Sequence, residues 1–181
     1  LFVAPEKNNI FEDVGQVIKS KVKNCTSNPN PVFKHDITDL SKIDYIVPPG
    51  NVEDYGEYKI FKTHSYMKGP NKVPVHAPID STLYQGIYIA EGGINQYGLF
   101  FEVSCEVSYV FDHIVDVSDK IAMVFSDEPV SDSSKLGSVD RVEVEAGELI
   151  GYSIGAEFEQ WDFGVYNSSK KREHADVDAP I

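Results

Sequence analysis

The stretch Phe101-Glu-Val-Ser-Cys-Glu-Val-Ser-Tyr109 alternates apolar and polar residues without a break. Successive side chains of a β-strand point to opposite faces, so this alternation predicts a strand with one buried and one solvated face. Short runs of the same kind, separated by Gly, Pro and Asn, follow one another from Gly56 to about Tyr166. That spacing is typical of a sandwich or barrel and predicts a mainly β fold.

Eight segments carry the pattern, and we expect each to form a strand: Tyr58–Thr63, Val73–Ala77, Ser81–Ala90, Gly98–Tyr109, Ile121–Phe125, Arg141–Val144, Leu149–Ile154 and Phe158–Tyr166. In the last of these, Trp161 shares a face with other apolar residues and Asp162 lies on the opposite, more polar face. We therefore expect Trp161 in the core and Asp162 facing a cleft.

The N-terminal part of the sequence has a different pattern. Apolar residues recur at helical spacing over residues 10–23, with acidic residues at the start and lysines at the end, which predicts an amphipathic helix. Such a helix packs on its own domain or docks on a partner. Prolines then interrupt the pattern, and a short strand is expected over Ile43–Val47. The predicted organisation is a helix and extended arm over 1–55, a β domain over 56–167 and a flexible charged tail over 168–181.

The chain of 181 residues has 16 basic and 29 acidic residues, a formal net charge of -13. This charge repels phosphate backbones, so we expect no nucleic-acid partner. No apolar run approaches the ~20 residues that a membrane-spanning helix needs, and we expect no transmembrane segment. Because the chain begins at Leu1 rather than Met, we expect that an upstream segment was removed by a signal peptidase or lies outside this sequence. The expected location is secreted, extracytoplasmic.

Cys25 and Cys105 lie 80 residues apart and fit no zinc-knuckle spacing. They are a candidate disulfide that would tie the arm to the β domain; a reactive thiol is the alternative. Two glycosylation sequons, at Asn24 and Asn167, agree with an extracytoplasmic location.

The order of four segments resembles that of the lysostaphin-type zinc metallopeptidases, which are glycyl-glycine endopeptidases with a duplicated hybrid motif. These segments are Val73-Pro-Val-His-Ala-Pro-Ile-Asp-Ser-Thr-Leu83, Gln96-Tyr-Gly-Leu-Phe-Phe-Glu-Val103, Ser108-Tyr-Val-Phe-Asp-His-Ile114 and Val144-Glu-Ala-Gly-Glu-Leu-Ile-Gly-Tyr-Ser-Ile-Gly155. The resemblance covers about 110 residues and implies a barrel-sandwich core.

The resemblance also implies a set of zinc ligands, which this chain retains only in part. His64 matches the histidine of the family's "his-x-gly-x-asp" segment, but Lys68 stands at the aspartate. Gln160 matches the first histidine of the "his-x-his" strand, and Asp162 matches the second, which is the zinc ligand in the family. A protonated lysine donates no lone pair to a metal. His64 and Asp162 remain candidate metal ligands, and His76 or Asp80 is a candidate third ligand.

His113 matches the family's active-site histidine, and it is the candidate catalytic residue. It would either hydrogen-bond a ligand from the groove or be a strand-end histidine satisfied by the backbone. The candidate binding groove consists of His64, Lys68, His113, Gln160 and Asp162.

Since most of the implied ligands are missing, the sequence predicts a degenerate, non-catalytic member with no cofactor. Its expected partner is a cell-envelope glycan, peptide or protein. The enzymatic alternative is a zinc peptidase with altered ligands, in which His113 stabilises an oxyanion or moves a proton. A third alternative is a structural component of an assembly that uses the helix at residues 10–23.

Overall fold

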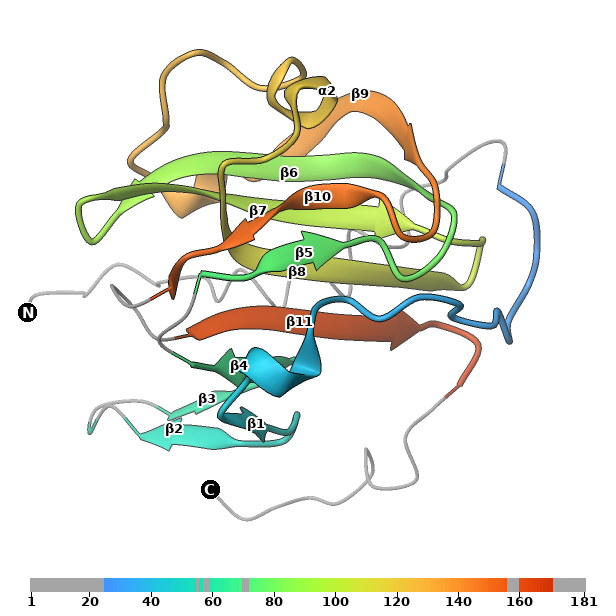
Figure 1. The fold of residues 1–181 in the computed structure, drawn as a ribbon, viewed down its shortest axis with the longest axis horizontal. Coiled ribbons are helices and arrows are strands. Elements are labelled where there is room, and N and C mark those ends of the chain that lie inside the picture. The colour runs from blue at the N-terminus through green and yellow to red at the C-terminus, as the bar shows by residue number, and fades with distance from the viewer. Residues whose placement is uncertain (1–24, 55, 57–58, 70–71, 156–159, 171–181) are drawn as a thin grey trace, which may run out of the picture.

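The computed structural model describes residues 25–54, 56, 59–69, 72–155 and 160–170. The expectation of a mainly β fold is confirmed. The described residues form a nine-stranded antiparallel sheet and a separate two-stranded one. Figure 1 shows how the strands lie relative to one another. The predicted helix at residues 10–23 lies outside the described residues.

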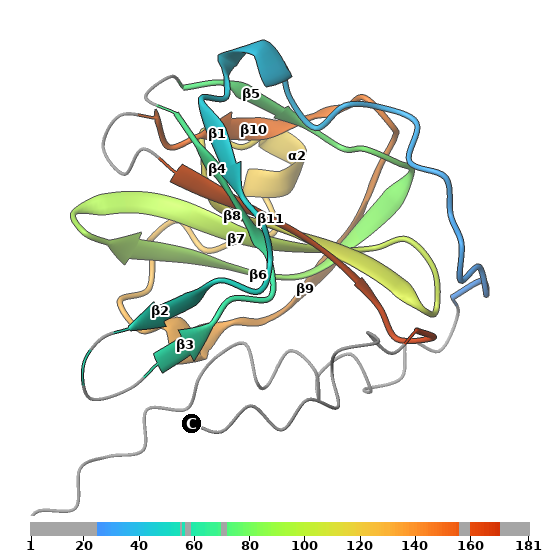
Figure 2. The ribbon, with the colours of Figure 1, turned by 90° about the horizontal axis from the view of Figure 1, so that it is seen from below.

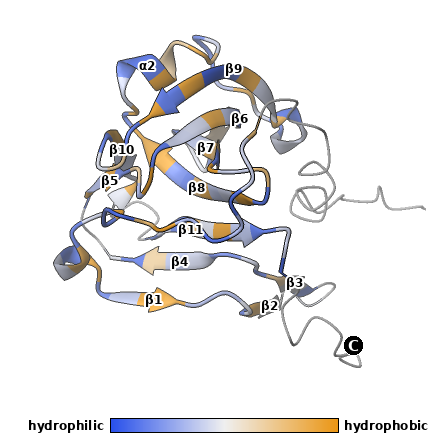
Figure 3. Cartoon of the chain, turned by 90° about the vertical axis from the view of Figure 1, so that its right-hand side faces the viewer, coloured by the Kyte–Doolittle hydropathy of each residue, from blue (hydrophilic) through white to orange (hydrophobic). Residues whose placement is uncertain are grey.

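The large sheet has the strand order β1-β4-β11-β8-β7-β6-β9, with β10 pairing both β8 and β5. Its strands are β1 (Tyr45–Val47), β4 (Ser65–Lys68), β5 (Pro74–His76), β6 (Ser81–Glu91), β7 (Ile94–Glu102), β8 (Val107–Val115), β9 (Gly137–Val144), β10 (Leu149–Ser153) and β11 (Gln160–Asn167). In Figure 3, hydrophobic and hydrophilic residues alternate along β9, and its apolar residues are the less exposed ones.

The small sheet consists of β2 (Val52–Asp54) and β3 (Lys59–Phe61). Figure 2 shows this pair lying apart from β5 and β10. Among the described residues, the helical elements are single turns: η1 (Leu40–Lys42), α2 (Asp119–Ala122) and η2 (Ser133–Lys135). In the described part of the chain, no helix has the length and apolar character required to cross a membrane.

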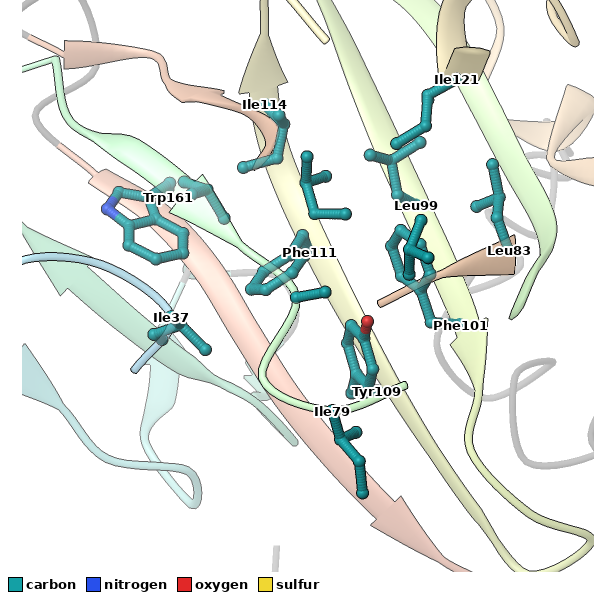
Figure 4. Packing of buried hydrophobic residues seen from close by; sticks show 14 of the residues in the cluster. Ile37, Ile79, Leu83, Leu99, Phe101, Tyr109, Phe111, Ile114, Ile121 and Trp161 are labelled. Atoms are coloured by element: carbon teal, nitrogen blue, oxygen red, sulfur yellow. The ribbon is translucent and has the colours of Figure 1, made fainter. Parts of the chain in front are cut away.

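Aromatic and branched side chains from β6, β7, β8, β10 and β11 form the core (Figure 4). The rings of Phe101 and Tyr109 stack with centroids 4.8 Å apart, and Tyr109 bonds its hydroxyl to the Ser81 hydroxyl at 2.7 Å. Trp161 is buried beside Phe111, with ring centroids 6.0 Å apart. The face of β11 that carries Trp161 therefore packs into the core, and the polar residues of β11 lie on its other face.

The arm before β1 lies along the β domain. A disulfide joins Cys25 to Cys105, and further along, His76 N donates to Ile37 O at 2.8 Å. Thr38 Oγ1 donates to Pro74 O at 2.7 Å. Ile37 contributes to the core.

Two predicted strands are wrong. The segment Gly98–Tyr109 is not one strand, because β7 ends at Glu102 and β8 begins at Val107. Ser104 makes the turn, since its Oγ accepts from Val107 N at 3.1 Å. The sequence still alternates through this turn, because the buried residues of β8 fall on the same alternate positions as those of β7. The segment Ile121–Phe125 is not a strand either: it starts within α2, whose turn buries Ile121.

Candidate functional site

Polar side chains collect on three neighbouring strands, on the face of the sheet opposite Trp161. Strand β11 pairs with β4 on one side and with β8 on the other, so that Asp162 lies between Tyr66 and Asp112. Gln160 lies opposite Lys68 in the same register. Since alternate residues of a strand share a face, β4, β11 and β8 bring these polar residues onto one surface.

His64 and Asp162 form the buried part of this surface. Their closest atoms, His64 Nε2 and Asp162 Oδ2, lie 3.1 Å apart, and the two residues are only 2% and 3% exposed. Tyr66 packs its ring against the His64 imidazole at right angles, with centroids 5.6 Å apart. Gly164 leaves the space for His64, because a Cβ at position 164 would lie 2.8 Å from His64 Cβ.

A β-bulge places Asp112 and His113 on the same side of β8. Leu99 pairs with Phe111 and Tyr97 pairs with Ile114, so two residues on β8 face Gly98 alone. His113 takes the left-handed backbone conformation, with φ 61°. Consecutive strand residues normally point to opposite faces, and a bulge is the device that redirects one of them. Both side chains consequently line the same pocket.

A second polar layer orients the His113 ring. Gln96, which is buried, donates from Nε2 to Glu91 Oε2 at 3.0 Å. This leaves its Oε1 facing His113 Nδ1 at 2.9 Å. An amide oxygen only accepts, so in the neutral ring Nδ1 carries the proton and Nε2 presents a lone pair. His113 Nε2 lies 3.8 Å from Asp162 Oδ2.

Asp112 and Asp162 are two carboxylates in close proximity. Ligand atoms of Asp112, His113 and Asp162 all lie within 4.8 Å of one another. Two carboxylates at that distance repel by roughly 3 kcal/mol at an effective dielectric of about 20. Burial raises the pKa of Asp112, His113 opposes the rise, and Asp162 adds to it. The pair therefore favours a positive charge or a hydrogen-bond donor beside it.

A pocket of about 220 Å³ opens over this cluster. Its apolar wall comes from Ile87, Ile89, Phe100 and Leu136, and its polar lining includes Lys62, Glu91, Asp112, His113, Ser133 and Asp162. The ammonium of Lys62 lies 5.3 Å from the centroid of the Tyr66 ring. In the part of the chain that the structure describes, three carboxylates and one lysine thus line the pocket. The pocket is suited to a small group that donates hydrogen bonds or carries positive charge.

The residues present do not fit the zinc set that the sequence resemblance implies. Lys68, at the position of the family's aspartate ligand, donates from Nζ to Oε1 of Gln160, which stands at the first histidine of the "his-x-his" strand. The Lys68 ammonium also lies 5.5 Å from the Tyr66 ring centroid, a cation–π contact. Of the predicted groove, His64, His113 and Asp162 converge, whereas Lys68 and Gln160 form a separate pair.

Neither candidate third ligand lines this pocket. His76 lies on β5 beside His35, with ring centroids 5.6 Å apart, and burial together with the His35 charge lowers the pKa of His76. Asp80 Oδ1 accepts from Ala146 N at 2.8 Å, which makes it part of a turn.

No family profile matches the sequence, and no curated protein matches it. Among solved structures, the chain is similar to Csd3 of Helicobacter pylori in an orthorhombic crystal, with 15% identity over 76% of this chain and 32% of that chain, and a TM-score of 0.43. For the hexagonal crystal of Csd3, the identity is 16% and the TM-score 0.41, over 76% of this chain and 31% of that chain. The matched region spans about a third of the Csd3 chain.

Sequence reasoning missed Asp112, Gln96 and Glu91. Asp112 directly precedes His113, so regular strand geometry would have placed it on the other face. Gln96 and Glu91 lie on either side of the hairpin turn that joins β6 to β7. The turn carries Gly92 and Gly93, both with positive φ, and glycine pairs of this kind are the available sequence signal for a tight hairpin.

Proposed function

We propose that this chain is a non-catalytic, extracytoplasmic ligand-binding domain with a peptidase-like ancestry. Its pocket over Asp112, His113 and Asp162 binds an amine or hydroxyl group of a cell-envelope glycopeptide or protein. The observation that carries this proposal is the bond between Lys68 and Gln160: an ammonium stands where the family has its aspartate ligand, and an amide at the first histidine of the "his-x-his" strand holds it there.

The size and charge of the pocket support this class of ligand. Pockets for drug-sized molecules span about 300–1,000 Å³, so about 220 Å³ accommodates one side chain or one sugar substituent. Its carboxylates attract N–H and O–H donors, and His113 adds the acceptor atom Nε2. Disulfides persist in oxidising compartments, so the Cys25–Cys105 bond supports an extracytoplasmic location.

Binding can be tested with a disaccharide–tetrapeptide fragment of peptidoglycan that carries a free amine, titrated by calorimetry in the presence of EDTA. We expect saturable binding that His113→Gln weakens about 10-fold, the usual cost of ~1.4 kcal/mol for a lost hydrogen bond. The matched control is His76→Gln, because His76 lies outside the pocket. The same fragment with its amine acetylated should bind more weakly than the free amine.

Three results would reject the proposal. They are no binding by the wild type, binding that His113→Gln leaves unchanged, and cleavage of the fragment by the wild-type protein. The convergence of His64, His113 and Asp162 specifically favours the zinc-hydrolase alternative. That alternative predicts turnover dependent on added Zn²⁺ and abolished by His64→Ala.

A further inference from the structure

We propose that Asp112, His113 and Asp162 bind one first-row transition-metal dication, such as Zn²⁺ or Mn²⁺, at a position displaced toward β8 from the zinc position implied by the family resemblance. The site shares the pocket of the proposed function, but its existence does not depend on which organic ligand binds there. It differs from the candidate pair His64 and Asp162, because Asp112 and His113 take the place of His64 as ligands.

The three donor groups have the spacing of a metal site. Their ligand atoms lie within 4.8 Å of one another. Metal–ligand bonds of about 2.0–2.2 Å place neighbouring ligand atoms ~3 Å apart and opposite ones ~4.3 Å apart. A small inward movement of these side chains therefore closes them around an ion.

An independent observation comes from the other oxygen of Asp162. This side chain is only 5% exposed, and its Oδ1 receives no hydrogen bond from any of the described residues. A buried carboxylate oxygen in that state is costly, because burial removes its water without supplying a replacement. Since Asp162 lines the pocket, a cation there satisfies the oxygen that the protein leaves unsatisfied.

The imidazole is prepared for metal binding by its neighbours. The Gln96 oxygen holds the proton on His113 Nδ1, so the lone pair of Nε2 is directed to the side of Asp162. Gln96 is itself fixed by Glu91. Ligating histidines typically donate their other N–H to an oxygen acceptor in this way, which fixes the tautomer and strengthens the ligand.

The bulge and one glycine place Asp112. The left-handed turn at His113 puts Asp112 and His113 over the same pocket. Gly98 accommodates the carboxyl, because a Cβ there would lie 3.1 Å from Asp112 Oδ1. Backbone strain of this kind persists where the surrounding structure holds it in place, and it concentrates at functional sites.

The ligand chemistry selects the class of ion. One imidazole with two carboxylates suits borderline first-row dications, whereas Ca²⁺ takes six to eight oxygen ligands, more than this cluster provides. We therefore expect Zn²⁺ or Mn²⁺ to bind and Ca²⁺ to bind far more weakly. A dication and an amine neutralise the same carboxylates, so they should compete for the pocket.

The experiment is equilibrium dialysis of the full chain against Zn²⁺ or Mn²⁺ without any glycopeptide, with bound metal measured by mass spectrometry. We expect one ion per chain. Asp112→Asn, which keeps the size of the side chain, should weaken binding at least ~100-fold because it removes a charged ligand. His64→Ala should weaken binding less than Asp112→Asn does, by about 10–100-fold, the usual effect of losing an outer-shell contact.

Mn²⁺ gives a second measurement that needs no variant. In the wild type it should broaden the amide signals of Gly98, His113 and Asp162 before those of Lys68 and Gln160. The proposal is overturned if the wild type retains no ion, if Asp112→Asn binds as the wild type does, or if His64→Ala abolishes binding while Asp112→Asn does not. Loss of metal binding with glycopeptide binding intact would reject this site and leave the proposed function standing.

Discussion

Gly164 shows how a single missing side chain shapes the site. It lies on β11, where its Cα hydrogen faces His64 of the neighbouring chain segment. Any larger residue would bring its Cβ to 2.8 Å from His64 Cβ and push His64 from its place beside Asp162. The spacing between His64 and Asp162 therefore depends on glycine at position 164.

We expect Gly164→Ala to destabilise the fold by ~1–3 kcal/mol, the usual cost of overpacking a filled interior. The new Cβ would lie 2.8 Å from His64 Cβ, an atom too close to the backbone to move aside. Urea unfolding measures the change. Gly137→Ala is the control, because the nearest atom to its Cβ is Lys135 O at 3.6 Å. Equal midpoints for the two variants would contradict this account of Gly164.

The site residues were predictable from the sequence to different degrees. His64, His113 and Asp162 were found through the family resemblance, and the structure brings them together. Asp112 was not found, because a one-residue shift in pairing has no clear signature in the sequence. The contact between Lys68 and Gln160 was not foreseen either, although both positions were identified.

At the scale of elements, the alternating pattern located most strands and misjudged their connections. Strand β6 runs from Ser81 to Glu91, close to the predicted segment. The sequence pattern did not indicate the turn between β7 and β8, because apolar residues continue at every second position through it. Strand β4 was not predicted, because its four residues, Ser65–Lys68, carry no clear alternation.

The turn between β7 and β8 also holds the arm, through Glu106. Its carboxylate accepts from Ser27 Oγ at 2.6 Å and from Asn28 N at 2.9 Å. Ser104 Oγ reaches the same carboxylate at 3.2 Å and donates to Asn28 O at 2.7 Å. The hydrogen bond from Ser27 is the main cause of a lowered pKa at Glu106; burial opposes it, and the Asn28 amide adds to it.

This lowered pKa predicts loosening of the arm in acid. A carboxyl that titrates lower when folded stabilises the fold above its ordinary pKa of about 4.3, and the contribution is lost as the pH falls through the folded pKa. We expect amide exchange at Asn28 to speed up below pH 4 relative to its rate at pH 7, after correction for intrinsic exchange. Glu106→Gln should show fast exchange at both pH values. A wild-type protection that does not change with pH would refute the role of the carboxylate.

At the scale of the whole molecule, one sheet brings distant parts of the chain together. Strand β11, near the C-terminal end of the described residues, lies between β4 and β8. The site draws on all three strands, so it forms only when the long-range pairings are made. Local sequence patterns carry no information on such pairings, which is why composition and periodicity predicted the fold class but not the pocket.

The disulfide acts on the same scale. Cys25 and Cys105 are separated by 80 residues, and the closed loop contains β1 to β7. A crosslink that closes so long a loop restricts the unfolded chain far more than the folded one. In the folded chain the arm already contacts the β domain at this point, since Cys105 N donates to Thr26 O at 3.1 Å. Its effect should therefore appear mainly in the stability of the protein.

We expect the double variant Cys25→Ser, Cys105→Ser to be less stable than the wild type by ~2–4 kcal/mol, somewhat below the ~4.5 kcal/mol that the chain-entropy estimate gives for such a loop. Guanidinium unfolding measures this as a lower midpoint with a larger dependence on denaturant, because the unfolded chain is more expanded. Dithiothreitol should lower the wild-type midpoint to that of the variant and leave the variant unchanged. If the variant unfolds at the wild-type midpoint, the contacts of Glu106 and the arm, rather than the crosslink, hold this end of the molecule together.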